Sequence, residues 1–129
     1  MKVPLADELK TYLIPVFERK AVSVLALDVS ELTSYADALI IVEAVSARQV
    51  TSVAEHIVRR MKQEGVTALG AEGIKGGEWA LLDYGATIIH VFDTQTRALY
   101  DLEGFWADAP EIDLGEFDLP QNPEDNDGL

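Results

Sequence analysis

The sequence predicts an α/β (α+β) protein: a single mixed β-sheet of about five strands with helices packed on it. Two observations support this class. Short apolar runs bounded by turn residues alternate with amphipathic helical stretches along the chain. The two clearest runs, residues 78–83 and 87–92, meet at a turn that contains Gly85. The length of 129 residues is typical of one domain with its own core.

The first helix is expected over residues 5–20, where apolar side chains recur at spacings of three and four. Pro15 removes a backbone donor and crowds the preceding turn, so we expect a kink near Thr11 or two short helices. Strands are expected over residues 22–29 and 38–42, because both runs are mostly apolar and a turn-like segment separates them.

A second helix is predicted over residues 46–64. Ser46 and Gln49 form a capping-box pattern at its start, in which each side chain can satisfy a free backbone amide. Apolar residues follow at helical spacing, and Gly65 suits the end of the helix. His56 is expected on the flank of this helix, without a functional role.

The predicted hairpin of residues 78–92 is the centre of the fold. Its second run is apolar on both faces except at His90, which is typical of a central strand covered on both sides. Side chains alternate along a strand, so Trp79, Leu81 and Asp83 share one face of the first run. A weaker strand over residues 68–72 precedes the hairpin, and a short helix over residues 94–106 follows it.

The chain is expected to divide into a folded domain, residues 1–110, and an acidic, disordered tail, residues 111–129. The tail holds seven of the 23 acidic residues and none of the ten basic ones. We therefore expect deletion of residues 111–129 to leave the melting temperature nearly unchanged. The remaining residues carry a net charge of -6, so the domain is acidic as well.

An acidic domain disfavours strong direct binding to nucleic acid, because cationic side chains supply most of that affinity. A basic protein surface is the more natural partner. No membrane partner is expected, since no apolar run is long enough to span a bilayer and no signal or transit peptide is apparent. The chain has no cysteine, which excludes disulfides and thiolate metal sites. These features indicate a soluble, cytoplasmic protein.

Residue types suited to catalysis are sparse. The sequence has neither a Gly-x-Gly-x-x-Gly motif nor a phosphate loop, so no nucleotide cofactor is indicated. The two histidines, His56 and His90, lie on different elements and predict no metal site. Asp83 and His90 could face each other across the hairpin, which would orient the imidazole as a general base. The favoured interpretation is that His90 is a buried strand histidine held by one hydrogen bond.

Three separated motifs resemble the ribosomal silencing factor (Iojap-like) family. The first is Glu78-Trp79-Ala80-Leu81-Leu82-Asp83-Tyr84-Gly85, followed by Ile88-Ile89-His90-Val91-Phe92 and then by Arg97, Tyr100-Asp101-Leu102-Glu103 and Trp106. Upstream, Leu27-Asp28-Val29, Ala36-Asp37 and Ser46-Ala47-Arg48-Gln49-Val50 fit the same pattern. The resemblance covers roughly residues 5–110.

This resemblance implies a factor that binds the large ribosomal subunit and represses translation when nutrients are scarce. The implied partner is a basic large-subunit ribosomal protein (number fourteen) on the intersubunit face, and the implied mechanism is steric exclusion of the small subunit. It also implies a nucleotidyltransferase-like topology without the catalytic motif, and no enzymatic activity. The residues carried over as partner contacts are Trp79, Leu81, Leu82, Asp83, Tyr84 and Tyr100.

Two alternatives remain open at this stage. One is a divergent nucleotidyltransferase-like enzyme that uses Asp83 and His90, although such chemistry requires two carboxylates aimed at one point. The other is a self-associating acidic module, a homodimer in which an exposed strand pairs with its twin.

Overall fold

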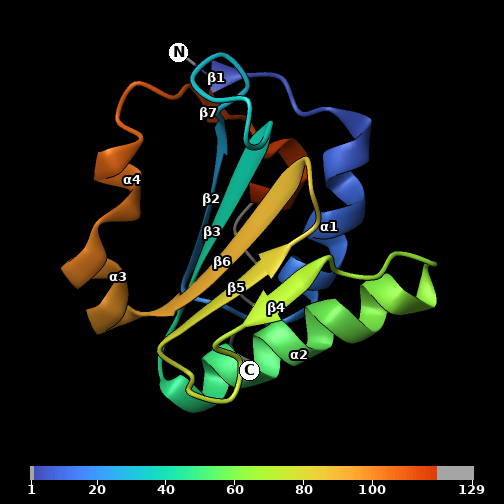
Figure 1. Ribbon diagram of the computed structural model, residues 1–129, viewed down its shortest axis with the longest axis vertical. Helices are drawn as coiled ribbons and strands as arrows, with labels where there is room; N and C mark the ends of the chain where they lie inside the picture. The colour runs from blue at the N-terminus through green and yellow to red at the C-terminus, as the bar shows by residue number, and fades with distance from the viewer. Residues whose placement is uncertain (1, 119–129) are drawn as a thin grey trace.

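The structure is a computed structural model that describes residues 2–118. It contains one seven-stranded sheet with helices on both faces (Figure 1). The strand order across the sheet is β1-β7-β2-β3-β6-β5-β4. The elements in chain order are β1 (Lys2–Val3), α1 (Asp7–Glu18), β2 (Ser23–Asp28), β3 (Ala38–Ala44), α2 (Ala47–Gln63), β4 (Gly70–Glu72), β5 (Trp79–Asp83), β6 (Thr87–Asp93), α3 (Thr94–Tyr100), α4 (Leu102–Phe105), β7 (Glu111–Ile112) and a short 3-10 helix (Gly115–Asp118).

The mixed sheet and its helices confirm the predicted class. The five expected strands are all present as β2 to β6, and β1 and β7 are additional two-residue strands. β3 and β6 pair in parallel at the centre, whereas β2–β3, β5–β6 and β4–β5 are antiparallel. The nucleotidyltransferase-like topology remains an expectation of the resemblance.

The core is divided between the two faces of the sheet. On one face, alternate side chains of β3 such as Ile40 and Val42 pack with apolar residues of α1 and α2. On the other face, Leu39 and Ile41 pack with Phe92 and with residues of the α3–α4 segment. Both faces of β3 and β6 are therefore covered, as the apolar runs predicted.

Helix α2 begins and ends as its capping residues predicted. Ser46 Oγ accepts a hydrogen bond from the Gln49 amide at 3.2 Å, and Gln49 Oε1 accepts one from the Val45 amide at 2.7 Å. Gly65 follows the helix with a φ of +86°, a left-handed conformation that suits glycine.

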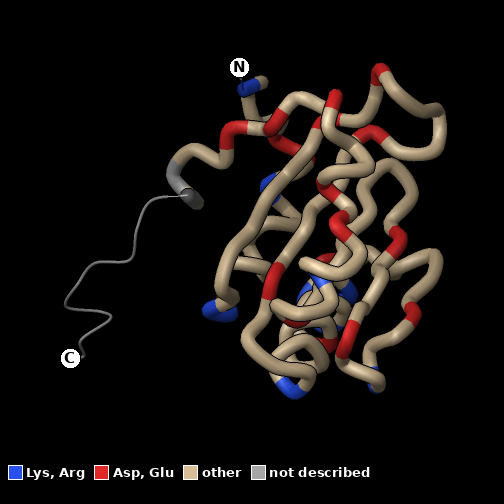
Figure 2. Tube along the Cα trace, turned by 90° about the vertical axis from the view of Figure 1, so that its left-hand side faces the viewer, with Lys and Arg blue, Asp and Glu red and all other residues tan. Residues whose placement is uncertain are grey.

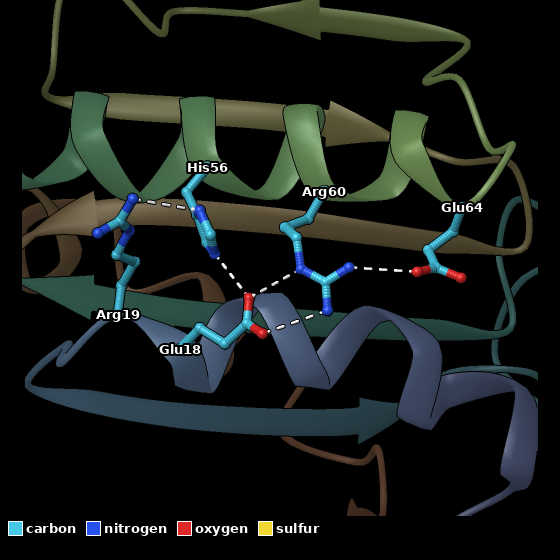
Figure 3. Close-up of polar contacts among 5 residues, drawn as sticks. All are labelled: Glu18, Arg19, His56, Arg60 and Glu64. Atoms are coloured by element: carbon cyan, nitrogen blue, oxygen red, sulfur yellow. Dashed lines mark hydrogen bonds and ion pairs between the residues drawn. The ribbon is translucent and has the colours of Figure 1, made fainter.

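A polar network joins α2 to the end of α1 (Figure 3). The carboxylate of Glu18 accepts hydrogen bonds from Arg60 at 3.1 and 3.2 Å, and it lies 2.7 Å from His56 Nε2. These contacts, those of Arg60 first, hold the pKa of Glu18 below its ordinary value. Arg19 Nη2 donates to His56 Nδ1 at 3.2 Å, so His56 is a member of a structural network on the helix flank.

Two expectations about the helices need correction. α1 is one continuous helix through Pro15, so the alternative of two short helices is wrong, while the kink expected near Thr11 stays a prediction. The predicted helix over residues 94–106 is instead two pieces, because Asp101 takes a left-handed conformation (φ +46°) between α3 and α4. Aspartate tolerates this conformation better than most residues do.

The expected boundary at residue 110 also needs correction, because the fold continues beyond it. Glu111 and Ile112 form β7, which pairs with β1 in parallel and with Leu27 of β2. Ile112 and Leu114 are buried in the same core as α1 and α2. A strand of two residues has too short a pattern to stand out in an acidic sequence. The expectation for residues 119–129 lies outside the described residues.

Burial of Ile112 predicts that the region first expected to be a tail stabilises the domain. We expect Ile112→Ala to lower the free energy of unfolding by about 2–5 kcal/mol, the usual range for a buried isoleucine. Urea unfolding monitored by circular dichroism measures this change. Leu99→Ala is the control, because that side chain is 77% exposed and its loss should change stability by less than about 0.5 kcal/mol. Equal effects of the two variants would show that β7 does not stabilise the fold.

Candidate protein interface

The alternation of β5 sends its side chains to opposite faces of the sheet. Ala80 and Leu82 are fully buried in the core beneath α1 and α2. Trp79 and Leu81 lie on the other face, where both are partly exposed. Leu82 therefore cannot contact a partner, and its carry-over as an interface residue is wrong.

Tyr84 lies in the turn after β5 and also packs toward the side of α1. Its ring centroid is 5.1 Å from that of Tyr12, and it borders the core beneath α1 and α2. Burial, with a smaller contribution from Tyr12, raises the pKa of Tyr84 to about 12. Its hydroxyl is buried and makes no hydrogen bond to any described residue. Tyr84 is thus separated from Trp79 by the thickness of the sheet.

Trp79 is the centre of an aromatic cluster on the exposed face. Its ring lies 4.9 Å from Phe92 and 4.9 Å from Tyr100, measured between centroids. Its indole Nε1 donates a hydrogen bond to His90 Nδ1 at 3.0 Å. The indole is therefore held on several sides, while Tyr100 beside it is 57% exposed.

His90 has the role that the sequence favoured, a buried strand histidine with one hydrogen bond. Burial lowers its pKa to about 4, and the bond from Trp79 requires an unprotonated Nδ1. Asp83 Oδ1 instead accepts a hydrogen bond from the backbone amide of Gly85 at 2.8 Å. This bond stabilises the turn, in which Gly85 has a φ of +87°. Asp83 and His90 make no hydrogen bond to each other in the described chain, so the hypothetical general-base pair is absent from this geometry.

Acidic side chains border this face. Glu72 of β4 lies directly opposite Leu81, so both side chains point to the same face as Trp79 and Asp83. Figure 2, seen from the side of α3 and α4, shows acidic positions scattered over the trace. We call Glu72, Trp79, Leu81, Asp83 and Tyr100 the Trp79 surface.

Sequence reasoning missed Glu72, and it did not single out two exposed apolar side chains of the segment 94–106. Leu99 and Phe105 are exposed at 77% and 79%. The segment is broken at Asp101; after the break Leu102 and Trp106 pack against the core of this face, and before it Tyr100 contacts the ring of Trp79. The pairing of Glu72 with Leu81 follows from strand register, which the sequence pattern alone did not fix.

The Trp79 surface offers contacts for a binding partner. Its exposed groups are aromatic rings, one aliphatic side chain and carboxylates, the combination that recognises a protein with basic residues. In residues 2–118, no group of three or more histidine and acidic side chains is arranged to hold a metal ion. The same described part contains no helix long and apolar enough to cross a membrane.

The sequence matches, over residues 5–128, the profile of the family described as "Ribosomal silencing factor during starvation". This chain belongs to that family. The match confirms the Iojap-like resemblance, and it extends beyond the residues on which the resemblance was based.

Named relatives agree with this assignment. The ribosomal silencing factor RsfS of Halalkalibacterium halodurans is 33% identical over 75% of this chain and 83% of its own length. The RsfS of Bacillus subtilis is 34% identical over 75% of this chain and 82% of its own. The chloroplastic protein Iojap of Zea mays is 31% identical over 75% of this chain and 42% of its own. The names of the two bacterial relatives describe regulators of the ribosome, which points away from an enzyme.

Two solved structures share the fold. A Bacillus halodurans protein superposes with a TM-score of 0.74 at 29% identity, covering 84% of this chain and 98% of its own. A Chromobacterium violaceum protein superposes with a TM-score of 0.73 at 30% identity, covering 95% of this chain and 98% of its own. The fold described above is therefore the fold of experimentally determined relatives.

The buried, neutral His90 predicts that this silencing factor loses stability in mild acid. The pKa of His90 falls from 6.5 to about 4 on folding. Between these pH values the imidazole is protonated in the unfolded chain but neutral in the folded chain. The free energy of unfolding should decrease between about pH 6.5 and pH 4 by about 3 kcal/mol more in the wild type than in His90→Gln. Glutamine retains an acceptor for Trp79 Nε1.

Urea unfolding at several pH values measures both proteins. Both proteins contain the same carboxylates, so their contributions to the pH dependence cancel when the two profiles are subtracted. The remaining difference is the contribution of the His90 imidazole. Parallel pH profiles for wild type and His90→Gln would contradict the assignment of a neutral, buried His90.

Proposed function

We propose that this protein silences ribosomes by binding the large ribosomal subunit through its Trp79 surface. The contact we propose is with a basic ribosomal protein, number fourteen of the large subunit, on the intersubunit face. A bound domain there would block joining of the small subunit and so repress translation when nutrients are limiting. The observation that carries this proposal is the exposed aromatic face around Trp79 and Tyr100 with its carboxylate border.

The geometry of Trp79 favours tight binding at low entropic cost. Its hydrogen bond to His90 and the contact of its ring with Phe92 hold the indole in one orientation before any partner arrives. A side chain that is already ordered loses little freedom on association. Trp and Tyr dominate the energetics of protein interfaces, and both occur here in contact with each other.

The charge of the domain supports a basic partner. The chain carries a formal net charge of -13, and Glu72 and Asp83 lie on the face of Trp79. Between residues 66 and 92 the sequence contains one basic residue, Lys75. Opposite charges on two proteins accelerate their encounter, and repulsion between like charges disfavours acidic competitors.

The proposed mechanism requires occlusion and no chemistry. A domain seated on a flat subunit surface excludes another subunit by its volume, so only the affinity and the position of the contact matter. The absence of an Asp83–His90 hydrogen bond in the described chain is in keeping with this view, and no specific observation favours the enzymatic alternative.

Loss of the exposed aromatic contact should weaken ribosome binding. We expect Tyr100→Ala and Trp79→Ala each to weaken the affinity for isolated large subunits, with a loss of about thirtyfold or more for Trp79 (about 2 kcal/mol). Co-sedimentation at moderate salt measures the affinity, with small subunits as the specificity control.

Tyr35→Ala is the matched variant, because Tyr35 is 71% exposed but lies in the loop before β3, at the opposite end of the sheet from Trp79. It should bind as the wild type does. If Trp79→Ala and Tyr100→Ala stay folded and still bind normally, the assigned surface is wrong even though the family assignment stands.

Occlusion also predicts an order-of-addition effect. Wild-type protein added to large subunits before small subunits should lower the yield of joined ribosomes, measured by sucrose-gradient sedimentation. Trp79→Ala should lower it much less at the same concentration, because occupancy falls with affinity. Normal binding of the wild type with an unchanged yield of joined ribosomes would rule out occlusion and leave the binding assignment intact.

A further inference from the structure

A cavity of about 410 Å³ lies on the side of the sheet opposite the Trp79 surface. It is open to solvent on one side and is bordered by the start of α1, the short strands β1 and β7, and the adjoining ends of β2, β3 and β6. Its volume is in the range of small-molecule binding sites. The inner wall is apolar and is formed by Val3, Leu9, Ala38 and Ile112.

One polar side chain lines this otherwise apolar wall. Thr87 is only 6% exposed, and it pairs with Ala38 across the parallel β3–β6 register, so both side chains point toward α1. The hydroxyl of Thr87 makes no hydrogen bond to any residue in the described part of the chain. A hydroxyl can both donate and accept a hydrogen bond. Thr87 therefore provides an unused polar contact inside the cavity.

The rim of the cavity is acidic. Glu8, Asp28 and Asp37 line it, and no basic residue does so among residues 2–118. Asp28 is held in place, because its Oδ1 accepts hydrogen bonds from the amide of Ser30 at 3.0 Å and from its hydroxyl at 2.6 Å. Three carboxylates around one opening favour a positively charged ligand and disfavour an anion, even at the start of a helix.

We propose that this cavity binds a small organic cation, with a primary ammonium or guanidinium group on a short aliphatic chain. The carboxylates at the rim and the hydroxyl of Thr87 accept hydrogen bonds from the cationic group, and the aliphatic chain packs on the apolar wall. Carbon atoms of the chain would contact Leu9 and Ile112, which come from opposite ends of the sequence. A bound ligand would thus hold α1 and β7 against the sheet.

Titration of the full chain with agmatine, followed by amide NMR, tests this site. The expected result is saturable shift changes confined to the amides around the cavity. The titration is run at about 0.15 M salt, where exposed charges more than about 8 Å apart are largely screened. This condition separates a built site from the general attraction of cations to an acidic protein.

Two near-isosteric variants give the quantitative test. Thr87→Val removes the hydroxyl and should weaken agmatine binding about threefold to tenfold, whereas Asp28→Asn should weaken it about tenfold or more. The side-chain oxygen of asparagine can still accept the hydrogen bonds from Ser30, so the conformation of the loop should be retained. Glu55→Gln makes the same change of charge on an exposed position of α2 away from the cavity, and it should leave the affinity unchanged.

Ala38→Leu fills the cavity from β3 and should abolish the localised shifts; its amide spectrum shows whether it is folded. If it does not fold, Thr87→Val and Asp28→Asn decide the question. The proposal is overturned by shifts that are unsaturable or spread over the acidic surface. It is also overturned if Glu55→Gln weakens binding as much as Asp28→Asn does, or if a folded Ala38→Leu protein binds as the wild type does.

Discussion

The parallel pairing of β3 with β6 is the constraint on which the rest of the structure depends. Seven residues of each strand are in register, from Ala38 opposite Thr87 to Ala44 opposite Asp93, and nearly all are buried. Parallel neighbours need a long connection, and here it contains α2 and the strands β4 and β5. Since both faces of this pair must be covered, α1 and α2 pack on one and the α3–α4 segment on the other (Figure 1).

The same constraint explains which parts of the fold could be predicted from the sequence. Runs such as 38–42 and 87–92 are apolar on both faces, and α2 has strong caps, so their patterns are clear. β1 and β7 were not predicted because two residues give no period to detect. The division at Asp101 depends on one left-handed residue, and a continuous helical pattern across it gave no warning.

The candidate interface was predictable only in part. The two-residue period of a strand is enough to place Trp79, Leu81 and Asp83 on one face. The same period puts Leu82 on the opposite face, where it is buried, although the family resemblance implied that it is a partner contact. The direction of Tyr84 is set by the turn and by Tyr12, which is distant in sequence. The contact between the rings of Tyr100 and Trp79 depends on how α3 packs on the sheet, which no local sequence pattern contains.

His90 connects the stability of the fold to the readiness of its binding face. A fully apolar residue at this position would pack as well, but it would leave the indole Nε1 of Trp79 without its partner at 3.0 Å. A neutral imidazole supplies this acceptor, and its pKa is low because burial disfavours the charged imidazolium. Because β6 pairs with β3 along its full length and with β5 on its other side, the histidine lies on a strand that is hydrogen-bonded at both edges. Under the proposed occlusion mechanism, a Trp79 surface that is already ordered would lose little freedom when a partner binds.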